Sequence, residues 1–197
     1  MNKKPGMPRK RPKQARSAVT VANILEAAAR ILESEGSTGY TTNAVARVAG
    51  VSIGSLYQYF PTKEVITREL IALSNNALLA DIQRIADLTP PKERLAGILD
   101  AAVKHQLRRP ALARLLDQLE SQLPVPPDTE ARKILVEIIR VSLTAAGFDR
   151  APEVESLDVI AITKGLVDAA GERGETNQEL LSIRVKRAVF GYLRQPD

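Results

Sequence analysis

Side chains that can hydrogen-bond to phosphates and to base edges are concentrated in one stretch, TNAVARVAGVSIGSLYQYFPTK, which begins at Thr42 and ends at Lys63. A hydroxyl at Thr42, a phenol at Tyr57 and an ammonium at Lys63 are typical phosphate-binding groups, which give affinity without sequence information. The carboxamides of Asn43 and Gln58 can each pair bidentately with adenine in the major groove. Groups of these types can contact nucleic acid when helices position them together.

The elements that must position these groups are two short helices joined by a tight turn. Gly50 is expected to close the first helix, because a residue there adopts the left-handed conformation, in which a Cβ is penalised. Thr42 and Ser52 are the predicted N-caps of the two helices. Leu56 and Phe60 would anchor the second helix on a core, and the whole pattern is that of a helix-turn-helix.

The run V-A-x-x-A-G-V-S-x-G-S-L-Y-x-Y-F-x-x-K resembles the DNA-binding domain of the TetR (tetracycline-repressor) family of bacterial transcription regulators, from about Val19 to Leu70. Its ending, L-Y-x-Y-F-x-x-K, is the distinctive part. The resemblance implies a three-helix DNA-binding domain followed by a larger helical domain for ligand binding and dimerisation. It also implies a homodimeric repressor that binds a palindromic operator in double-stranded DNA and is released by a small-molecule effector.

The resemblance assigns phosphate contacts to Thr42, Tyr57 and Lys63, and base reading to the starts of the two helices. Ile53 could pack on a thymine methyl group, although many relatives carry a polar or basic residue there. Core packing beside Phe60 is the alternative role for the tyrosines. The expected DNA-binding residues are Thr42, Asn43, Ser52, Ile53, Gly54, Ser55, Tyr57, Gln58, Tyr59 and Lys63.

Composition and charge agree with a helical DNA-binding protein. Only 4% of the 197 residues are aromatic and no period-two strand pattern is present, so an all-α fold of about nine helices is expected. Residues 1–67 hold ten Lys and Arg against four Glu, whereas the rest of the chain holds 18 bases and 19 acids. Positive charge is therefore concentrated around the helix-turn-helix, as DNA binding requires.

The predicted domains are a disordered basic arm over 1–16, a DNA-binding domain over 17–66 and a ligand-binding and dimerisation domain over 67–197. The arm combines three prolines with seven bases and no acid, and it could follow phosphates, enter the minor groove or serve only as a solubilising tail. The chain has no cysteine, signal-peptide pattern or membrane-spanning run. A cytoplasmic, nucleoid-associated protein without metal or cofactor is expected.

Apolar periodicity and proline positions divide the second domain into helices near 62–87, 91–107, 110–122, 128–146, 152–170 and 177–194. The helix over 128–146 is apolar nearly all round, so it is predicted to be the buried centre of this domain.

Three polar residues of this domain are candidates for ligand binding. Gln106 and Ser142 fall within apolar stripes, where a polar group must find a partner in the protein or in a ligand, and an internal hydrogen bond is the alternative for both. His105 lies at the edge of its stripe, but a single histidine does not make a metal site. Lys164 and Asp168 are expected to form an ion pair within their helix or between subunits.

The last two helices are the expected dimer interface. Apolar residues cover two sides of the first of them, so it needs two partners, one of which a second subunit can supply. On the last helix one face is apolar and Arg184, Arg187 and Arg194 lie opposite it. The predicted interface residues are Leu157, Ala161, Leu181, Val185, Ala188, Val189 and Tyr192.

Other functions remain at this point. An enzyme is disfavoured because the sequence lacks a nucleophilic cysteine, a Gly-rich phosphate loop and a serine partnered with its single histidine. A DNA-organising or partner-recruiting protein without an inducer would have the same helix-turn-helix, so the evidence from that motif supports it equally. A transcriptional activator also fits, because the sign of regulation depends on where the operator lies.

Overall fold

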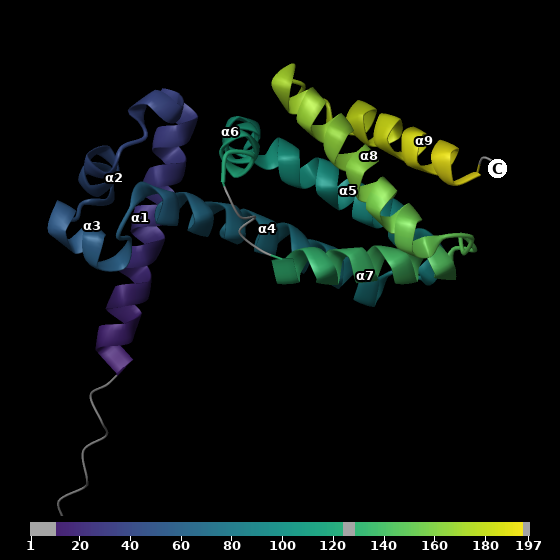
Figure 1. Ribbon diagram of the computed structural model, residues 1–197, viewed down its shortest axis with the longest axis horizontal. Helices are drawn as coiled ribbons and strands as arrows, with labels where there is room; N and C mark the ends of the chain where they lie inside the picture. The colour runs from purple at the N-terminus through teal and green to yellow at the C-terminus, as the bar shows by residue number, and fades with distance from the viewer. Residues whose placement is uncertain (1–10, 124–128, 195–197) are drawn as a thin grey trace, which may run out of the picture. The chain divides into compact units, whose positions relative to one another are not determined.

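A computed structural model describes residues 11–123 and 129–194 of the chain (Figure 1). In these two ranges the protein consists of nine helices and contains no strand, so the predicted all-α fold is confirmed. The chain divides after Thr67 into two compact units. The helices are α1 Arg11–Gly39, α2 Thr42–Ala49, α3 Ile53–Tyr59, α4 Lys63–Leu88, α5 Pro91–Arg108, α6 Pro110–Glu120, α7 Thr129–Ala145, α8 Pro152–Glu172 and α9 Gln178–Arg194.

Helix α1 begins at Arg11, six residues before the predicted start, so the second part of the expected basic arm is helical. Residues 1–10 of that arm lie outside the described range. At Gly36 the backbone leaves the helical conformation, with φ at 65° and ψ at −164°. The predicted end of the first helix is therefore the place where α1 is interrupted, and glycine accepts this φ at no steric cost.

The core of the first unit is built on the apolar stripe of α1. Its members are buried and α1 packs against α2, whose Val45 and Ala46 are buried as well. Leu56 of α3 and Phe60 complete the core, as the sequence predicts. The buried residues of α1 are Ile24, Leu25, Ala27, Ala28, Ala29, Ile31 and Leu32.

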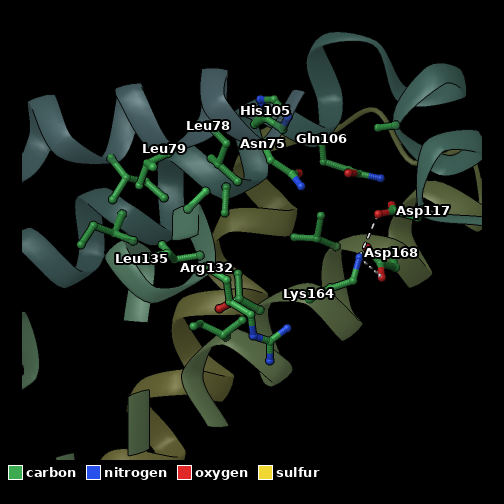
Figure 2. A pocket seen from close by; sticks show the side chains of 18 of the residues that line it. Asn75, Leu78, Leu79, His105, Gln106, Asp117, Arg132, Leu135, Lys164 and Asp168 are labelled. Carbon is green, nitrogen blue, oxygen red and sulfur yellow. Dashed lines mark hydrogen bonds and ion pairs between the residues drawn. The ribbon is translucent and has the colours of Figure 1, made fainter. Parts of the chain in front are cut away.

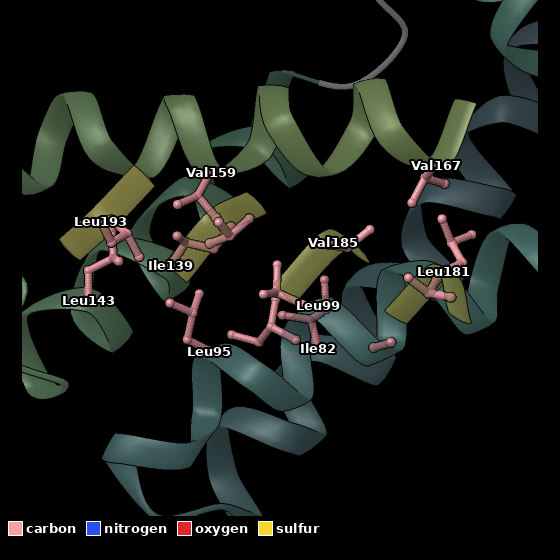
Figure 3. Packing of buried hydrophobic residues seen from close by; sticks show 14 of the residues in the cluster. Ile82, Leu95, Leu99, Ile139, Leu143, Val159, Val167, Leu181, Val185 and Leu193 are labelled. Carbon is pink, nitrogen blue, oxygen red and sulfur yellow. The ribbon is translucent and has the colours of Figure 1, made fainter. Parts of the chain in front are cut away.

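The second unit has one apolar core to which α4, α5, α7, α8 and α9 all contribute (Figure 3). Helix α7 gives only Ile139 and Leu143 to it as fully buried apolar side chains, while Val141 is exposed. The prediction that this helix is the buried centre is therefore wrong. Helix α5 holds that place, because Leu95, Leu99 and their neighbours are buried and α5 packs on α7, α8 and α9.

Helix α9 turns a different face to the core from the one expected to meet a second subunit. Leu181, Val185 and Val189 are 0% exposed and belong to the core of their own subunit. Figure 3 shows Leu181 and Val185 among the other core side chains. The assignment of all three to a dimer interface is corrected, because a side chain with no accessible surface cannot touch another molecule. Ala188 is half-buried, and Tyr192 is exposed.

None of the helices described is both long enough and apolar enough to cross a membrane.

Candidate functional site

The turn between α2 and α3 has the backbone geometry that the sequence predicts. Gly50 ends α2 in the left-handed conformation, with φ at 69°, and the amide of Val51 donates to the carbonyl oxygen of Ala46 at 3.0 Å. Ser52 is the N-cap of α3, and its Oγ accepts a hydrogen bond from the amide of Ser55 at 3.0 Å. This Gly50 and Ser52 pair sets the path of the chain into the second helix.

The N-cap of α2 is Thr41 and not Thr42. The Oγ1 of Thr41 accepts from the amide of Ala44 at 3.2 Å, which leaves the Thr42 hydroxyl on the first turn of the helix. There it is hydrogen-bonded to the phenol oxygen of Tyr57 at 3.1 Å. The structure thus brings together two residues, 15 positions apart, that the resemblance assigns to phosphates.

Lys63 begins α4 over the ring of a buried tyrosine. Its Nζ lies 5.5 Å from the ring centroid of Tyr40, which favours a fixed place for the ammonium. The Tyr40 phenol is 3.2 Å from Oγ1 of Thr67, and Thr67 donates its hydroxyl proton to the Lys63 carbonyl at 3.1 Å, so the phenol is the donor to Thr67. Burial raises the pKa of Tyr40 to about 12, so the phenol stays protonated at neutral pH.

The residues expected to read bases lie on the surface of the first unit. Asn43, Gly54 and Gln58 are exposed, and Ile53 is 38% exposed, so all four side chains or backbone positions are accessible to another molecule. Tyr57 is also exposed, so the alternative of core packing is wrong for it. Tyr59 is half-buried.

Gly54 offers a test of close DNA approach that leaves the fold intact. A Cβ added there would meet no atom closer than the Ser52 Oγ at 4.0 Å, so the folded protein has room for Gly54→Ala. Because alanine is the better helix former by roughly 0.5–1 kcal/mol, stability should be unchanged or slightly higher. If the backbone approaches the groove here, we expect specific DNA affinity to fall about tenfold, the loss of roughly one base contact. Thermal unfolding and DNA titration of the same sample measure both effects, and unchanged affinity would contradict a role for Gly54.

A cavity of about 490 Å³ lies in the second unit, among helices α4 to α8 (Figure 2). This volume suits a small organic ligand. Most of its wall is apolar, and all five helices contribute to it. The apolar lining residues are Leu78, Leu79, Ile82, Ile98, Leu99, Ala102, Ala113, Ala131, Leu135, Ile139, Val159, Ile160 and Val167.

Two of the three predicted ligand-binding residues line this cavity. Gln106 is 6% exposed, and its Nε2 has no hydrogen-bond partner in the described protein. His105 is hydrogen-bonded through Nε2 to the Ser74 hydroxyl at 3.0 Å, and burial lowers its pKa. Ser142 is not part of the lining, and its hydroxyl donates to the Ile138 carbonyl of its own helix at 2.7 Å, so the internal alternative is confirmed for it.

Polar residues that the sequence did not single out gather at one end of the cavity. Asp117 and Glu120 of α6 and Thr163 of α8 belong to the lining. Lys164 donates to Asp117 at 2.8 Å and contacts Asp168 at 3.1 Å, so the expected ion pair within α8 is present and extends to α6. The sequence gave a signal only for Lys164 and Asp168, which lie four residues apart on one helix. The contact with Asp117 could not be predicted, because the position of α6 beside α8 depends on the fold.

Exposed apolar residues lie along α8 and α9, which pack side by side (Figure 1), and on α9 the exposed Arg184 and Arg187 lie among them. We call this region the α8/α9 surface. It contains three residues predicted for a dimer interface, Leu157, Ala161 and Tyr192, and others that were not predicted. Small residues allow another helix to come close along it. Its members are Val154, Leu157, Ala161, Gly165, Leu180, Ile183, Gly191 and Tyr192, all exposed.

Comparison of sequences relates the first unit to known regulators. Residues 24–70 match the profile of bacterial regulatory proteins of the tetR family. The nucleoid occlusion factor SlmA of Vibrio atlanticus is 38% identical over 95 residues, which cover 47% of this chain and 48% of the relative. An uncharacterized HTH-type transcriptional regulator, Rv1255c of Mycobacterium tuberculosis, is 29% identical over 99 residues, 50% of this chain and 49% of the relative. The chain thus spans about half the length of these curated relatives.

Solved structures share the fold over nearly the whole chain. A TetR transcription regulator from Haloarcula marismortui has a TM-score of 0.75 at 17% identity and covers 88% of this chain and 98% of its own. A bacterial regulatory protein of the tetR family from Rhodococcus has a TM-score of 0.72 at 17% identity, covering 90% and 98%. The fatty acid degradation regulator FadR of Bacillus halodurans has a TM-score of 0.70 at 16% identity, covering 89% and 99%.

Proposed function

Because this chain belongs to the tetR family of bacterial regulatory proteins by its DNA-binding domain and its fold, we propose that it is a ligand-responsive repressor. In this proposal it binds a palindromic operator as a homodimer and releases it when a small molecule occupies the cavity of the second unit. The observation that carries the proposal is an exposed helix-turn-helix surface in one unit together with a 490 Å³ cavity in the other.

In this proposal the exposed side of α2 and α3 meets the major groove. Thr42, Tyr57 and Lys63 bind phosphates and fix the register of the protein on the duplex. The carboxamides of Asn43 and Gln58 face base edges, and the exposed Ile53 packs on a thymine methyl group. Its exposure supports this role, because no protein neighbour covers more than part of the side chain.

Two copies of the chain are proposed to meet through the α8/α9 surface. A two-fold axis there would present two α3 helices to successive major grooves, about 34–36 Å apart on the DNA. The exposed leucines and the alanine and glycine positions of this surface support the proposal, since they allow a close, apolar helix contact.

Helix α4 is the proposed route from effector to DNA. It supplies Lys63 at its first residue, and further along it supplies Asn75, Leu78, Leu79 and Ile82 to the cavity wall. An effector that binds more tightly to a conformation with a different spacing of the recognition helices would lower operator affinity. The coupling requires only this difference in affinity between the two states.

Two alanine variants test the division between phosphate and base contacts. Lys63→Ala should weaken binding to all duplexes together and lower the slope of log affinity against log salt concentration by about one, the loss of one phosphate contact. Asn43→Ala should change the preference among operators by roughly 1–3 kcal/mol at one base position. Affinities for a panel of duplexes at several salt concentrations measure both.

Lys104→Ala is the matched control, because Lys104 is exposed on α5 in the second unit. It should leave both the affinity and the salt slope unchanged. A uniform loss across all sequences for Asn43→Ala, or an unchanged salt slope for Lys63→Ala, would contradict the assigned roles.

A second candidate function is a DNA-organising protein without an inducer. The names of the nucleoid occlusion factors, which match about half of this chain, favour it. It shares the DNA-binding surface, so only the cavity separates the two functions. A compound that binds the cavity and changes operator affinity supports the repressor, whereas cavity binding without any effect on DNA affinity supports the DNA-organising protein.

A further inference from the structure

The polar end of the cavity carries more negative than positive charge. Three carboxyl groups and two basic groups line it: Asp117, Glu120, Asp168, Arg132 and Lys164. The acids are half-buried, whereas Lys164 and Arg132 are exposed. Figure 2 shows Asp117, Asp168 and Lys164 together, with Gln106 nearby, and Leu79 and Leu135 at the opposite end. With all five groups ionised, their formal charges sum to −1.

The cations of the protein do not fully compensate these acids. Lys164 is shared between Asp117 and Asp168. Burial raises the pKa of Glu120, and Asp117 raises it further, while Lys164 opposes the change. Burial also raises the pKa of Asp168, again with a contribution from Asp117. An added positive charge in this place would stabilise the ionised carboxylates.

Three hydrogen-bonding groups of the cavity wall are unused by the described part of the protein. The Nδ1 of His105, the Nε2 of Gln106 and the Oγ1 of Thr163 are buried and have no partner, and Gln106 and Thr163 are more than nine-tenths buried. Buried polar groups are almost always hydrogen-bonded, so these groups point to a bound molecule. The Nε2 of Gln106 is a donor, so it requires an acceptor on that molecule and does not itself bind a positive charge. No cluster of His, Asp and Glu within residues 11–123 and 129–194 is arranged to hold a metal ion.

We propose that the effector is an organic cation with a mainly apolar body, which places its positive group beside Asp117, Glu120 and Asp168. The apolar body lies against the leucine and isoleucine side chains at the other end of the cavity. The proposal rests on the repressor function above, because it names the ligand of the same cavity. A fatty acid or another anionic amphiphile would bring its charge to the acidic end, where repulsion opposes it.

Three probes with the same ten-carbon chain isolate the contribution of charge: decylammonium, decanol and decanoate. Calorimetric titration of the full chain without DNA, below the micelle concentration of each probe, measures binding directly. Decylammonium should bind at least about tenfold more tightly than decanoate, with decanol between them. Equal affinities, or tighter binding of decanoate, would overturn the proposal.

Glu120→Gln shows whether the cation occupies this end of the cavity. The substitution keeps the size of the side chain, and loss of a carboxylate whose ionised form is disfavoured by burial should not destabilise the fold. We expect a several-fold loss of decylammonium affinity with little change for decanol. Glu172→Gln, at an exposed position of α8 outside the lining, is the control. Equal decylammonium affinity for the parent protein and Glu120→Gln would place the cation elsewhere and overturn the proposal.

The same probes distinguish this inference from the function on which it rests. Release of operator DNA by decanoate but not by decylammonium would reject the cationic effector and keep the repressor. Tight decylammonium binding that depends on Glu120 but leaves DNA affinity unchanged would keep the ligand class and reject the repressor.

Discussion

Ala161→Arg is expected to make the protein monomeric and to weaken binding to a palindromic site by on the order of 10³-fold, toward the non-specific level. Ala161 is exposed near the middle of the α8/α9 surface. An arginine there would hold apart two helices that must approach closely, and like charges would face each other across a two-fold axis. Sedimentation at micromolar concentration and operator titration measure the two losses.

Ala145→Arg is the matched control for this variant, because Ala145 is exposed at the end of α7 and lies outside the α8/α9 surface. It should keep the oligomeric state and the DNA affinity of the parent protein. A dimeric Ala161→Arg protein with full operator affinity would show that the two copies meet through another surface.

Leu181→Ala is expected to lower the free energy of unfolding by about 2–5 kcal/mol, a large part of the stability of a domain of this size. Leu181 is 0% exposed, so its truncation leaves a cavity within the core of the second unit. Its neighbour Leu180 is 56% exposed, and Leu180→Ala should change the stability of the single subunit by less than about 0.5 kcal/mol.

Denaturant unfolding in the Ala161→Arg background separates subunit stability from dimerisation, which would otherwise stabilise the folded state. In the background without that substitution, Leu180→Ala should weaken the dimer, whereas Leu181→Ala should lower the stability of the subunit itself. The reverse pattern would restore the assignment of Leu181 to the interface.

These neighbouring leucines also show where the sequence stops determining the fold. Both faces of α9 carry apolar residues, and the three arginines on one side suggested that this side faces water. The structure buries the line of Leu181, Val185 and Val189 in the subunit and leaves Leu180 and Ile183 exposed on the other side. Periodicity gives the helix, but the choice between two apolar faces depends on the neighbouring helices.

The helix-turn-helix was the most predictable part of the chain, because its signals are local. Gly50 is required by a positive φ, and Ser52 caps the helix that follows it. The N-cap of α2 was predicted at Thr42 and lies at Thr41, an error of one residue. It arose because two adjacent threonines can cap a helix equally well. The role of Tyr40 in placing Lys63 was missed, because it depends on a hydrogen bond to Thr67 of α4, 27 positions along the chain.

The cavity was predictable only in part. Gln106 and Ser142 gave the same signal, a polar residue within an apolar stripe, but only Gln106 faces the cavity. A serine hydroxyl is short enough to bond to the carbonyl four residues earlier, whereas a glutamine amide reaches away from its own helix. Asp117, Glu120 and Lys164 meet because α6 packs on α8, which no single helix pattern contains.

Selection of binding sites from random duplex DNA with the purified full chain tests the central claim most directly. Affinity for the best selected site would then be measured at several salt concentrations. We expect a two-fold palindrome whose half-sites lie about one helical turn apart, bound roughly 10³-fold or more above background at physiological salt. Enrichment of no sequence, with binding that disappears at moderate salt, would contradict a sequence-specific regulator and favour a DNA-organising protein.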